Sequence, residues 1–221
     1  GGERAVKAFR RVCLFALLSM IGCNVAIART AAAPKWPDTA LARTQALALL
    51  QTLNADLLSH DSATLTLEHW CGAHHMATPA RVVAQRVHGG DKPLPPEWRA
   101  RLAIDAGEPV KYRRVRLKCG DHVLSEADNW YLPNRLTAAM NRQLDSTDTP
   151  FGKVVQPLHF RRKTLSAELL WSPLPDGWEL RVTQVPAGRG TLAIPHELLQ
   201  HRALLFAGDG RPFSALVETY T

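Results

Sequence analysis

The chain has 221 residues, of which 46% are hydrophobic and 7% aromatic, so it is long and apolar enough for one globular domain with a full core. It has no internal repeat and no low-complexity run, which excludes solenoid and disordered classes. The formal net charge of +7 falls to +4 (23 basic and 19 acidic side chains) without residues 1–28, a mildly basic balance that suits a small anion as well as nucleic acid.

The first 28 residues have the pattern of an export signal. Four basic residues precede an apolar run, Val12–Cys23, that is too short to span a bilayer comfortably, and residues 26–28 supply the small-x-small pattern of a signal-peptidase site. Residues 20–23 also form a loose lipoprotein box, in which the signal would end before Cys23 and that cysteine would carry the lipid. A buried N-terminal helix is the alternative. We therefore predict a periplasmic or lipid-anchored protein that meets the membrane only through this signal or anchor.

Cys71 and Cys119 are the cysteines outside the predicted signal. In an oxidising compartment such a pair can close a disulfide, and two buried thiols are the equal alternative. Their separation of 48 positions, with no nearby ligand pattern, does not indicate a zinc site. The histidines that follow Cys71 include His74 and His75, which as neighbours point in different directions and are typical of solvated loop residues. We expect no metal and no organic cofactor.

Two helices are predicted after a proline-containing linker, residues 29–38, at the start of a domain over residues 39–221. Either Asp38 or Thr39 can cap the first helix, and either Asp61 or Ser62 can cap the second. Helical spacing places the leucines of the first helix largely on one face and predicts that three apolar residues of the second pack inward. These residues are Leu41, Leu49, Leu50, Leu53, Leu57 and Leu58, then Leu65, Leu67 and Trp70.

Mostly consecutive strands follow, interrupted by one helix. The tight turn Gly120-Asp121 joins two long strands, and a turn at residues 208–210 reverses the last hairpin. The expected strands are 81–87, 109–119, 122–132, 158–171, 178–185, 198–206 and 212–220, with a short helical turn over 98–102 and a helix over 134–144. Helices first and antiparallel strands afterwards predict an α+β fold, a single antiparallel sheet of about six strands with helices on one face.

Common catalytic and nucleotide-binding signatures are absent from the sequence. There is no phosphate-binding glycine loop, no dinucleotide fingerprint and no nucleophile elbow. The basic run Arg161–Lys163 has no interleaved aromatic residues and is typical of a solvated strand end. We therefore expect no nucleic-acid partner.

The order of several short motifs resembles that of chorismate lyases over roughly residues 55–221. The motifs, in chain order, are Asp61-Ser62-x-Thr64, Arg114 within a basic strand, Cys119-Gly120-Asp121, the strand end Leu132-Pro133, Thr149-Pro150-Phe151-Gly152 and Glu218 in the last strand. These enzymes release pyruvate from chorismate and leave 4-hydroxybenzoate, a precursor of ubiquinone. The resemblance implies their fold, in which helices cover one side of an antiparallel sheet and the ligand lies enclosed beneath helical flaps.

The resemblance also implies roles for five residues. Arg114 matches the family's carboxylate-binding arginine and Glu218 its acid at the ring-oxygen end of the ligand, so both are the expected catalytic residues. Ala63 matches, by position, a residue that offers its backbone amide to the carboxylate. Phe151 and Gly152 belong to the turn that precedes the pocket-lining segment, so they join Ala63 and Arg114 as expected substrate-binding residues.

The chemistry of these residue types suits such roles. An arginine fork binds a carboxylate in a bidentate way that lysine cannot, and helix N-terminal amides near Ala63 would add positive potential. A carboxylic acid at Glu218, kept protonated by burial, can protonate the leaving ether oxygen. Strand alternation places Arg114 on one face with Arg116 and Lys118, however, and a solvated charged face makes the same pattern.

Two features depart from the family. Asn129 stands where the family strand has an arginine, and an exported protein would not meet chorismate, which is made in the cytosol. Three hypotheses follow: a chorismate pyruvate-lyase (a carbon–oxygen lyase, cytoplasmic as the family usually is), a non-catalytic exported protein of the same fold that binds a small aromatic or carboxylate ligand, and a structural envelope lipoprotein with no pocket. Ligand-sensing domains of some transcription regulators share the fold, which favours the second hypothesis, in which the fold binds a ligand without catalysis. The expected partner is a small anionic aromatic or cyclohexadiene ligand, and the expected state is a monomer.

Overall fold

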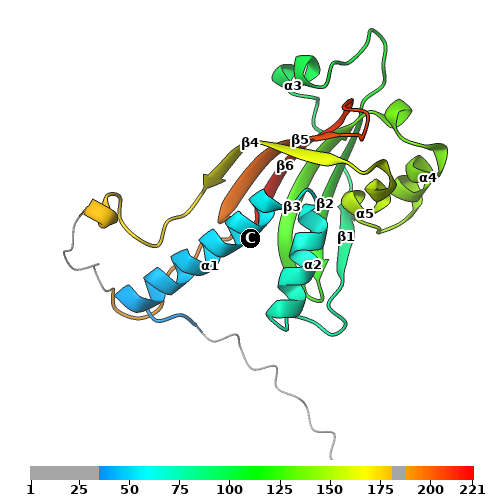
Figure 1. Cartoon of the computed structure of the whole chain (residues 1–221). Coiled ribbons are helices and arrows are strands. Elements are labelled where there is room, and N and C mark those ends of the chain that lie inside the picture. The colour runs from blue at the N-terminus through cyan, green and yellow to red at the C-terminus, as the bar shows by residue number, and fades with distance from the viewer. Residues whose placement is uncertain (1–34, 181–187) are drawn as a thin grey trace, which may run out of the picture. The chain divides into compact units, whose positions relative to one another are not determined.

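Six strands form one antiparallel sheet (Figure 1). The computed structural model describes residues 35–180 and 188–221, and the order across the sheet is β1-β2-β3-β6-β5-β4, with every neighbouring pair antiparallel. The strands are β1 (Val82–Val87), β2 (Lys111–Cys119), β3 (His122–Tyr131), β4 (Arg161–Leu169), β5 (Leu199–Phe206) and β6 (Pro212–Tyr220). The prediction of an α+β fold with a single antiparallel sheet of about six strands is confirmed.

Helices cover both faces of this sheet unequally. Four of the five α-helices in the described residues contribute to two apolar clusters on one face, where α1 and α2 lie across the front of the sheet in Figure 1. The helix α3 packs Trp98 against Leu204 and Ala215. Those two residues alternate with Leu205 and Leu216 of the other face, so α3 covers the opposite side. The helices are α1 (Ala40–Ser59), α2 (Ala63–Ala73), α3 (Pro96–Arg101), α4 (Ala138–Ser146) and α5 (Phe151–Val154).

The sequence predicted the start of α1 and α2 but not all of their buried residues. Thr39 Oγ1 accepts a hydrogen bond from Ala42 N at 3.1 Å, and Ser62 Oγ accepts one from Leu65 N at 3.3 Å, so both predicted caps are present. The buried stripe of α1 is instead Ala42, Ala46, Leu50 and Leu57. Leucines off this stripe point to solvent, as does one in α2, and the prediction was wrong for Leu41, Leu49, Leu58 and Leu65.

Several predicted segments lie outside the described residues or differ from the prediction. The predicted signal peptide, its two alternative cleavage sites and most of the predicted linker fall within residues 1–34, outside the described residues. Residues 36–38 are not a linker, because they hydrogen-bond with residues 190–192. Trp178–Leu180 form a 3-10 helix rather than the start of a strand, and the rest of that predicted strand is not described. A 3-10 turn over Pro133–Arg135 delays the start of α4.

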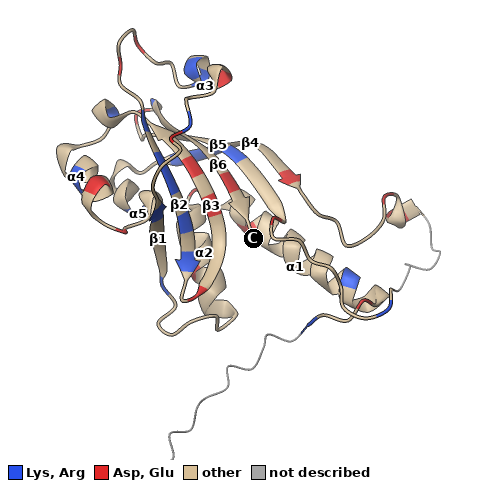
Figure 2. Cartoon of the chain, turned by 180° about the vertical axis from the view of Figure 1, so that it is seen from behind, with Lys and Arg blue, Asp and Glu red and all other residues tan. Residues whose placement is uncertain are grey.

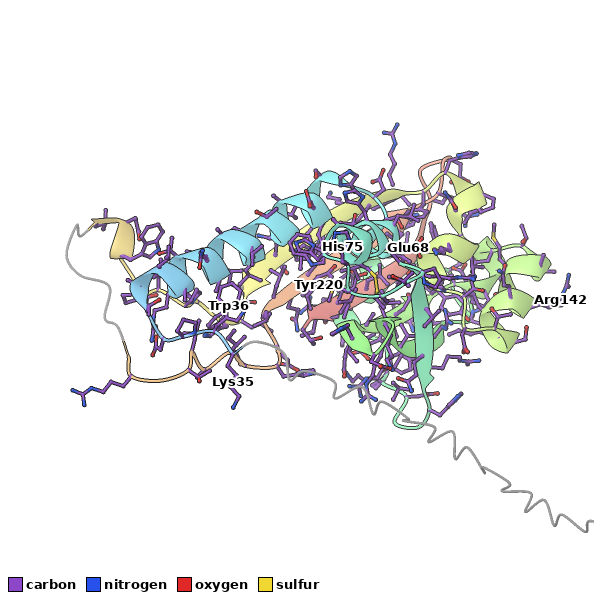
Figure 3. All side chains as sticks on the ribbon, turned by 90° about the horizontal axis from the view of Figure 1, so that it is seen from below. Lys35, Trp36, Glu68, His75, Arg142 and Tyr220 are labelled. Carbon is purple, nitrogen blue, oxygen red and sulfur yellow. A yellow bond between two sulfur atoms is a disulfide. The ribbon has the colours of Figure 1, made fainter. Side chains whose placement is uncertain are left out.

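A disulfide joins Cys71 of α2 to Cys119 at the end of β2, with 6.3 Å between the two Cα atoms. The same helix is held at its middle by Glu68, labelled in Figure 3, which accepts hydrogen bonds from Val82 N at 2.8 Å and from Lys153 Nζ at 2.5 Å. These links tie α2 to β1, β2 and α5. Within residues 35–180 and 188–221, none of the helices has the length and apolar character needed to cross a bilayer.

Candidate functional site

A small cavity lies on the helix-covered face, between the start of α2, the start of α5 and the strands behind them. Ser62, Ala63 and Thr64 line it from α2, and Phe151 and Gly152 line it from α5. The strands contribute charged, polar and apolar side chains, namely Arg113, Val115, Leu117, Ala127, Asn129, Arg162, Leu205, Leu216 and Glu218. The cavity has a volume of about 40 Å³, well below the roughly 150 Å³ of an apolar cavity that admits benzene.

Of the five residues for which the sequence suggested a ligand role, Ala63, Phe151, Gly152 and Glu218 line this cavity together. They come from α2, α5 and β6, which are far apart in the chain. Gly152 permits the close approach of the two helices, because a Cβ at this position would lie 3.2 Å from both Ser62 Oγ and Thr64 Oγ1. The structure therefore brings these four residues together but leaves their roles to be tested.

The fifth residue, Arg114, lies on the opposite face of the sheet, which corrects the prediction that it faces the cavity. Its Nη2 donates a hydrogen bond to Glu126 Oε2 at 3.1 Å, its Nε lies 3.9 Å from Asp128, and its side chain is 35% exposed. Figure 2 shows this surface, with basic residues along β2 beside acidic residues on β3. Strand alternation explains the error, since Arg114 shares its face with Arg116 and Lys118.

The neighbouring residue, Arg113, takes the place expected for Arg114. It is only 4% exposed and shares its face of β2 with Val115 and Leu117. Its Nη2 donates to Thr149 O at 3.2 Å, whereas its Nε and Nη1 have no hydrogen-bond partner among the described residues. Burial, together with the charge of Arg86, lowers the pKa of Arg113 to about 10. At the wall of the cavity this buried guanidinium thus has no ion-pair partner among the described residues, and the carboxylates of Asp145 and Asp148 act on it only from a distance.

A second buried arginine in the cavity wall is paired with a carboxylate. Arg162 Nη2 lies 2.5 Å from Glu218 Oε2, and the two side chains are 3% and 7% exposed. Burial alone would lower the pKa of Arg162, but the charges of Glu218 and Tyr220 and the hydrogen bonds with them together outweigh burial and raise that pKa. Tyr220 Oη donates to the same Glu218 oxygen at 3.2 Å, and burial and this carboxylate raise the pKa of Tyr220 (labelled in Figure 3) well above its usual value. Sequence reasoning missed Arg162 because it belongs to the run that resembled a solvated strand end.

Two further buried polar side chains lie on the same face of the sheet, Asn129 in the cavity lining and His201 next to Glu218 but outside that lining. Asn129 Oδ1 accepts a hydrogen bond from Ser214 Oγ at 2.6 Å, and its Nδ2 has no partner among the described residues. His201, opposite Glu218 in the β5–β6 register, is fully buried and lies 2.8 Å from Asn54 Oδ1 through Nε2. Burial, aided by the charge of Arg162, lowers the pKa of His201 to about 4, so the ring is neutral at pH 7.

The start of α2 adds positive potential to the same cavity. The first turn of a helix leaves amide N–H groups without intrahelical acceptors, and the helix dipole favours an anion there. The described part of the chain contains no group of three or more His, Cys, Asp and Glu side chains positioned to hold a metal. The arrangement suits the binding of a small anion between Arg113 and the α2 amides.

Comparisons with solved structures find transcriptional regulators. PhnF from Mycobacterium smegmatis is 12% identical, over 80% of this chain and 79% of that one, with a TM-score of 0.47. The ligand-binding domain of a putative GntR-family regulator from Bordetella bronchiseptica is 18% identical, over 64% and 83% of the two chains, with a TM-score of 0.41. The C-terminal domain of a histidine utilization repressor from Pseudomonas syringae is 16% identical, over 63% and 91%, with a TM-score of 0.40. At these identities and TM-scores the likenesses carry no argument about ligand or activity.

Comparisons of sequence give one near relative. No model of a known protein family matches the chain. The uncharacterized protein y4mC of Sinorhizobium fredii is 54% identical over 188 residues, which cover 85% of this chain and 79% of that protein. Identity at this level over most of both chains shows common descent and a common fold. The chain belongs to the same family as y4mC of Sinorhizobium fredii.

Proposed function

We propose that this domain binds a small organic anion without transforming it, and that Arg113 holds the anion's carboxylate. The single observation that carries the proposal is the burial of Arg113 with two guanidinium nitrogens unpartnered among the described residues, at the wall of a cavity. Removing a charge from water costs several kcal/mol unless a partner compensates. A carboxylate that accepts a hydrogen bond from Nε or Nη1 would supply both a counter-charge and a missing acceptor.

Binding is favoured over chorismate lyase chemistry by the contacts of Glu218. Its Oε2 lies 2.5 Å from Arg162 Nη2 and accepts a hydrogen bond from Tyr220 Oη at 3.2 Å. This oxygen is already engaged by two protein groups, so it is not free to act on a leaving oxygen of the ligand. Chorismate, a ring with two carboxylates, also exceeds a cavity of about 40 Å³, since a cavity that admits benzene has roughly 150 Å³. The observations therefore support ligand binding more than elimination of pyruvate.

The proposal includes an oxidising location, the periplasm or the envelope surface. The link between Cys71 and Cys119 supports it, because structural disulfides persist outside the cytosol. The basic and apolar start of the chain agrees with export. Sequencing the N-terminus of the mature protein tests this part, and an intact residue 1 on protein recovered from the cytosol would overturn it.

The test of ligand binding compares two adjacent arginines. Calorimetric titration of the mature protein with acetate, propionate and benzoate should show binding that acetamide, propionamide and benzamide lack. Arg113→Met should weaken carboxylate binding about 10- to 100-fold, the value of a charge-assisted hydrogen bond or two. The same variant should be at least as stable as wild type, because it removes an unpaired buried charge.

Arg114→Met is the matched control, since it changes the next residue on the other face and should leave affinity unchanged. Equal loss in both variants, or no carboxylate binding by the wild type, would refute the proposal. Incubation with chorismate tests the lyase alternative directly. Release of pyruvate and 4-hydroxybenzoate, abolished by Glu218→Gln, would replace binding with catalysis.

A further inference from the structure

We infer that the ligand is a short-chain monocarboxylate, and that Glu218, through its ion pair with Arg162, excludes ligands with a second negative charge. This inference rests on the proposed function and names the class of anion that the same cavity accepts. The first observation that supports it is the net charge of the buried side chains around the cavity.

Three ionised side chains in the cavity wall are at least nine-tenths buried. Arg113 is 4% exposed, and the side chains of Arg162 and Glu218 are 3% and 7% exposed. Glu218 neutralises Arg162 at 2.5 Å, so Arg113 alone remains uncompensated. The buried wall therefore carries a net charge of +1, and one carboxylate balances it.

A second carboxylate on the ligand would find no favourable place within the described lining. Beside Arg113 the wall is largely apolar, with Phe151, Phe160 and branched side chains of β2, β5 and β6. Of the other charged groups, Arg162 is already neutralised by Glu218 at 2.5 Å, and Asp61, whose Oδ1 accepts from Arg162 N at 2.7 Å, adds a further acidic group at the exposed rim. Like charges placed together at a desolvated site cost several kcal/mol, which is the usual basis of rejection.

The size of the cavity restricts the uncharged end of the ligand. A cavity of about 40 Å³ is well below the roughly 150 Å³ that admits benzene, so a two- to three-carbon acid should fit it better than a ring. Each methylene that fits should gain about 0.8 kcal/mol, or roughly fourfold in affinity, against the apolar wall. Propionate should therefore bind better than acetate, and benzoate, which needs more room, should bind less well than propionate.

The experiment removes the negative charge of Glu218 while keeping the volume of its side chain. Calorimetry measures propionate and malonate with the wild-type protein and with Glu218→Gln. The wild type should prefer propionate by at least about tenfold. In Glu218→Gln, Arg162 loses its counter-charge and the wall carries +2, so malonate should gain at least about tenfold relative to propionate.

The outcomes separate this inference from the function on which it rests. Wild-type protein that binds malonate as well as propionate, or a Glu218→Gln variant with an unchanged preference, would overturn the inference while small-anion binding survives. Wild-type protein that binds neither acid would overturn small-anion binding itself. Circular dichroism checks that Glu218→Gln folds, and the wild-type preference for propionate remains a decisive measurement if it does not.

Discussion

The two faces of the sheet hold arginines in opposite environments, and the contrast is clearest for two consecutive residues of β2. Arg114, on the open face, is 35% exposed and lies near two carboxylates. Arg113, on the helix-covered face, is 4% exposed and has none of the described carboxylates as a hydrogen-bond partner. An exposed charge that is paired needs no further explanation. A buried charge left unpaired indicates that another group, absent from the described residues, supplies its counter-charge.

The largest contrast in stability should come from breaking one ion pair on each face. Arg162→Met leaves Glu218 buried and uncompensated, so it should lower the free energy of unfolding by about 3–5 kcal/mol. Arg116→Met removes a half-exposed partner of Glu126, 3.0 Å away, and should cost under about 1 kcal/mol. Urea denaturation of the two variants measures both values. Similar losses of unfolding free energy in the two variants would show that the two ion pairs do not differ in the way their burial suggests.

A smaller effect should appear in acid, from a histidine on the helix-covered face. Because the pKa of His201 is near 4 in the folded chain and about 6.5 when unfolded, the unfolded chain takes up more protons between these values. The free energy of unfolding should therefore fall as the pH drops from about 6.5 to about 4, by on the order of 3 kcal/mol in total.

Denaturation at several pH values checks this dependence. His201→Gln should flatten the slope in that window, whereas His88→Gln, at an exposed position, should leave it unchanged. Parallel pH profiles for the wild type and His201→Gln would contradict the assignment. Carboxylates with lowered pKa values contribute their own loss in acid, so the difference between the variants is the informative quantity.

The smallest expected effect distinguishes a change in ligand affinity from a change in folding stability on the helix-covered face. Gly152→Ala adds a Cβ 3.2 Å from two hydroxyls at the cavity wall, so α5 must shift by a few tenths of an ångström. We expect a change in stability within about 1 kcal/mol and a loss of several-fold in propionate affinity. Gly72→Ala, whose Cβ would meet Ala80 at an ordinary 3.4 Å, is the control and should bind propionate normally. Equal affinities in the two variants would place the ligand elsewhere.

Local sequence signals were enough to predict much of the fold. Thr39 and Ser62 cap their helices as expected, and the alternation in β2 groups Arg114 with Arg116 and Lys118 on one face. That alternation also placed Arg113 with Val115 and Leu117, a signal of burial that the motif resemblance overrode. The position of an arginine in a family motif carried less information here than the pattern of its own strand.

The rest of the site depends on pairings that no local pattern contains. Arg162 meets Glu218 across 56 positions of sequence, through the β4–β5 and β5–β6 registers. A basic run such as 161–163 looks solvated until its partner strand is known. The exposed leucines of α1 show the converse, because helical spacing finds a stripe but not which stripe faces the sheet: Ala42 and Ala46, rather than larger neighbours, lie on the buried one.

The bond between Cys71 and Cys119 has a practical consequence for every measurement above. It fastens the helix whose first turn lines the cavity to the strand that carries Arg113. Protein produced under reducing conditions would lack this disulfide. In the chain-entropy model, closing a loop of this length stabilises the folded state by about 4 kcal/mol. A failed titration is therefore informative only for protein whose thiols have been shown to be oxidised.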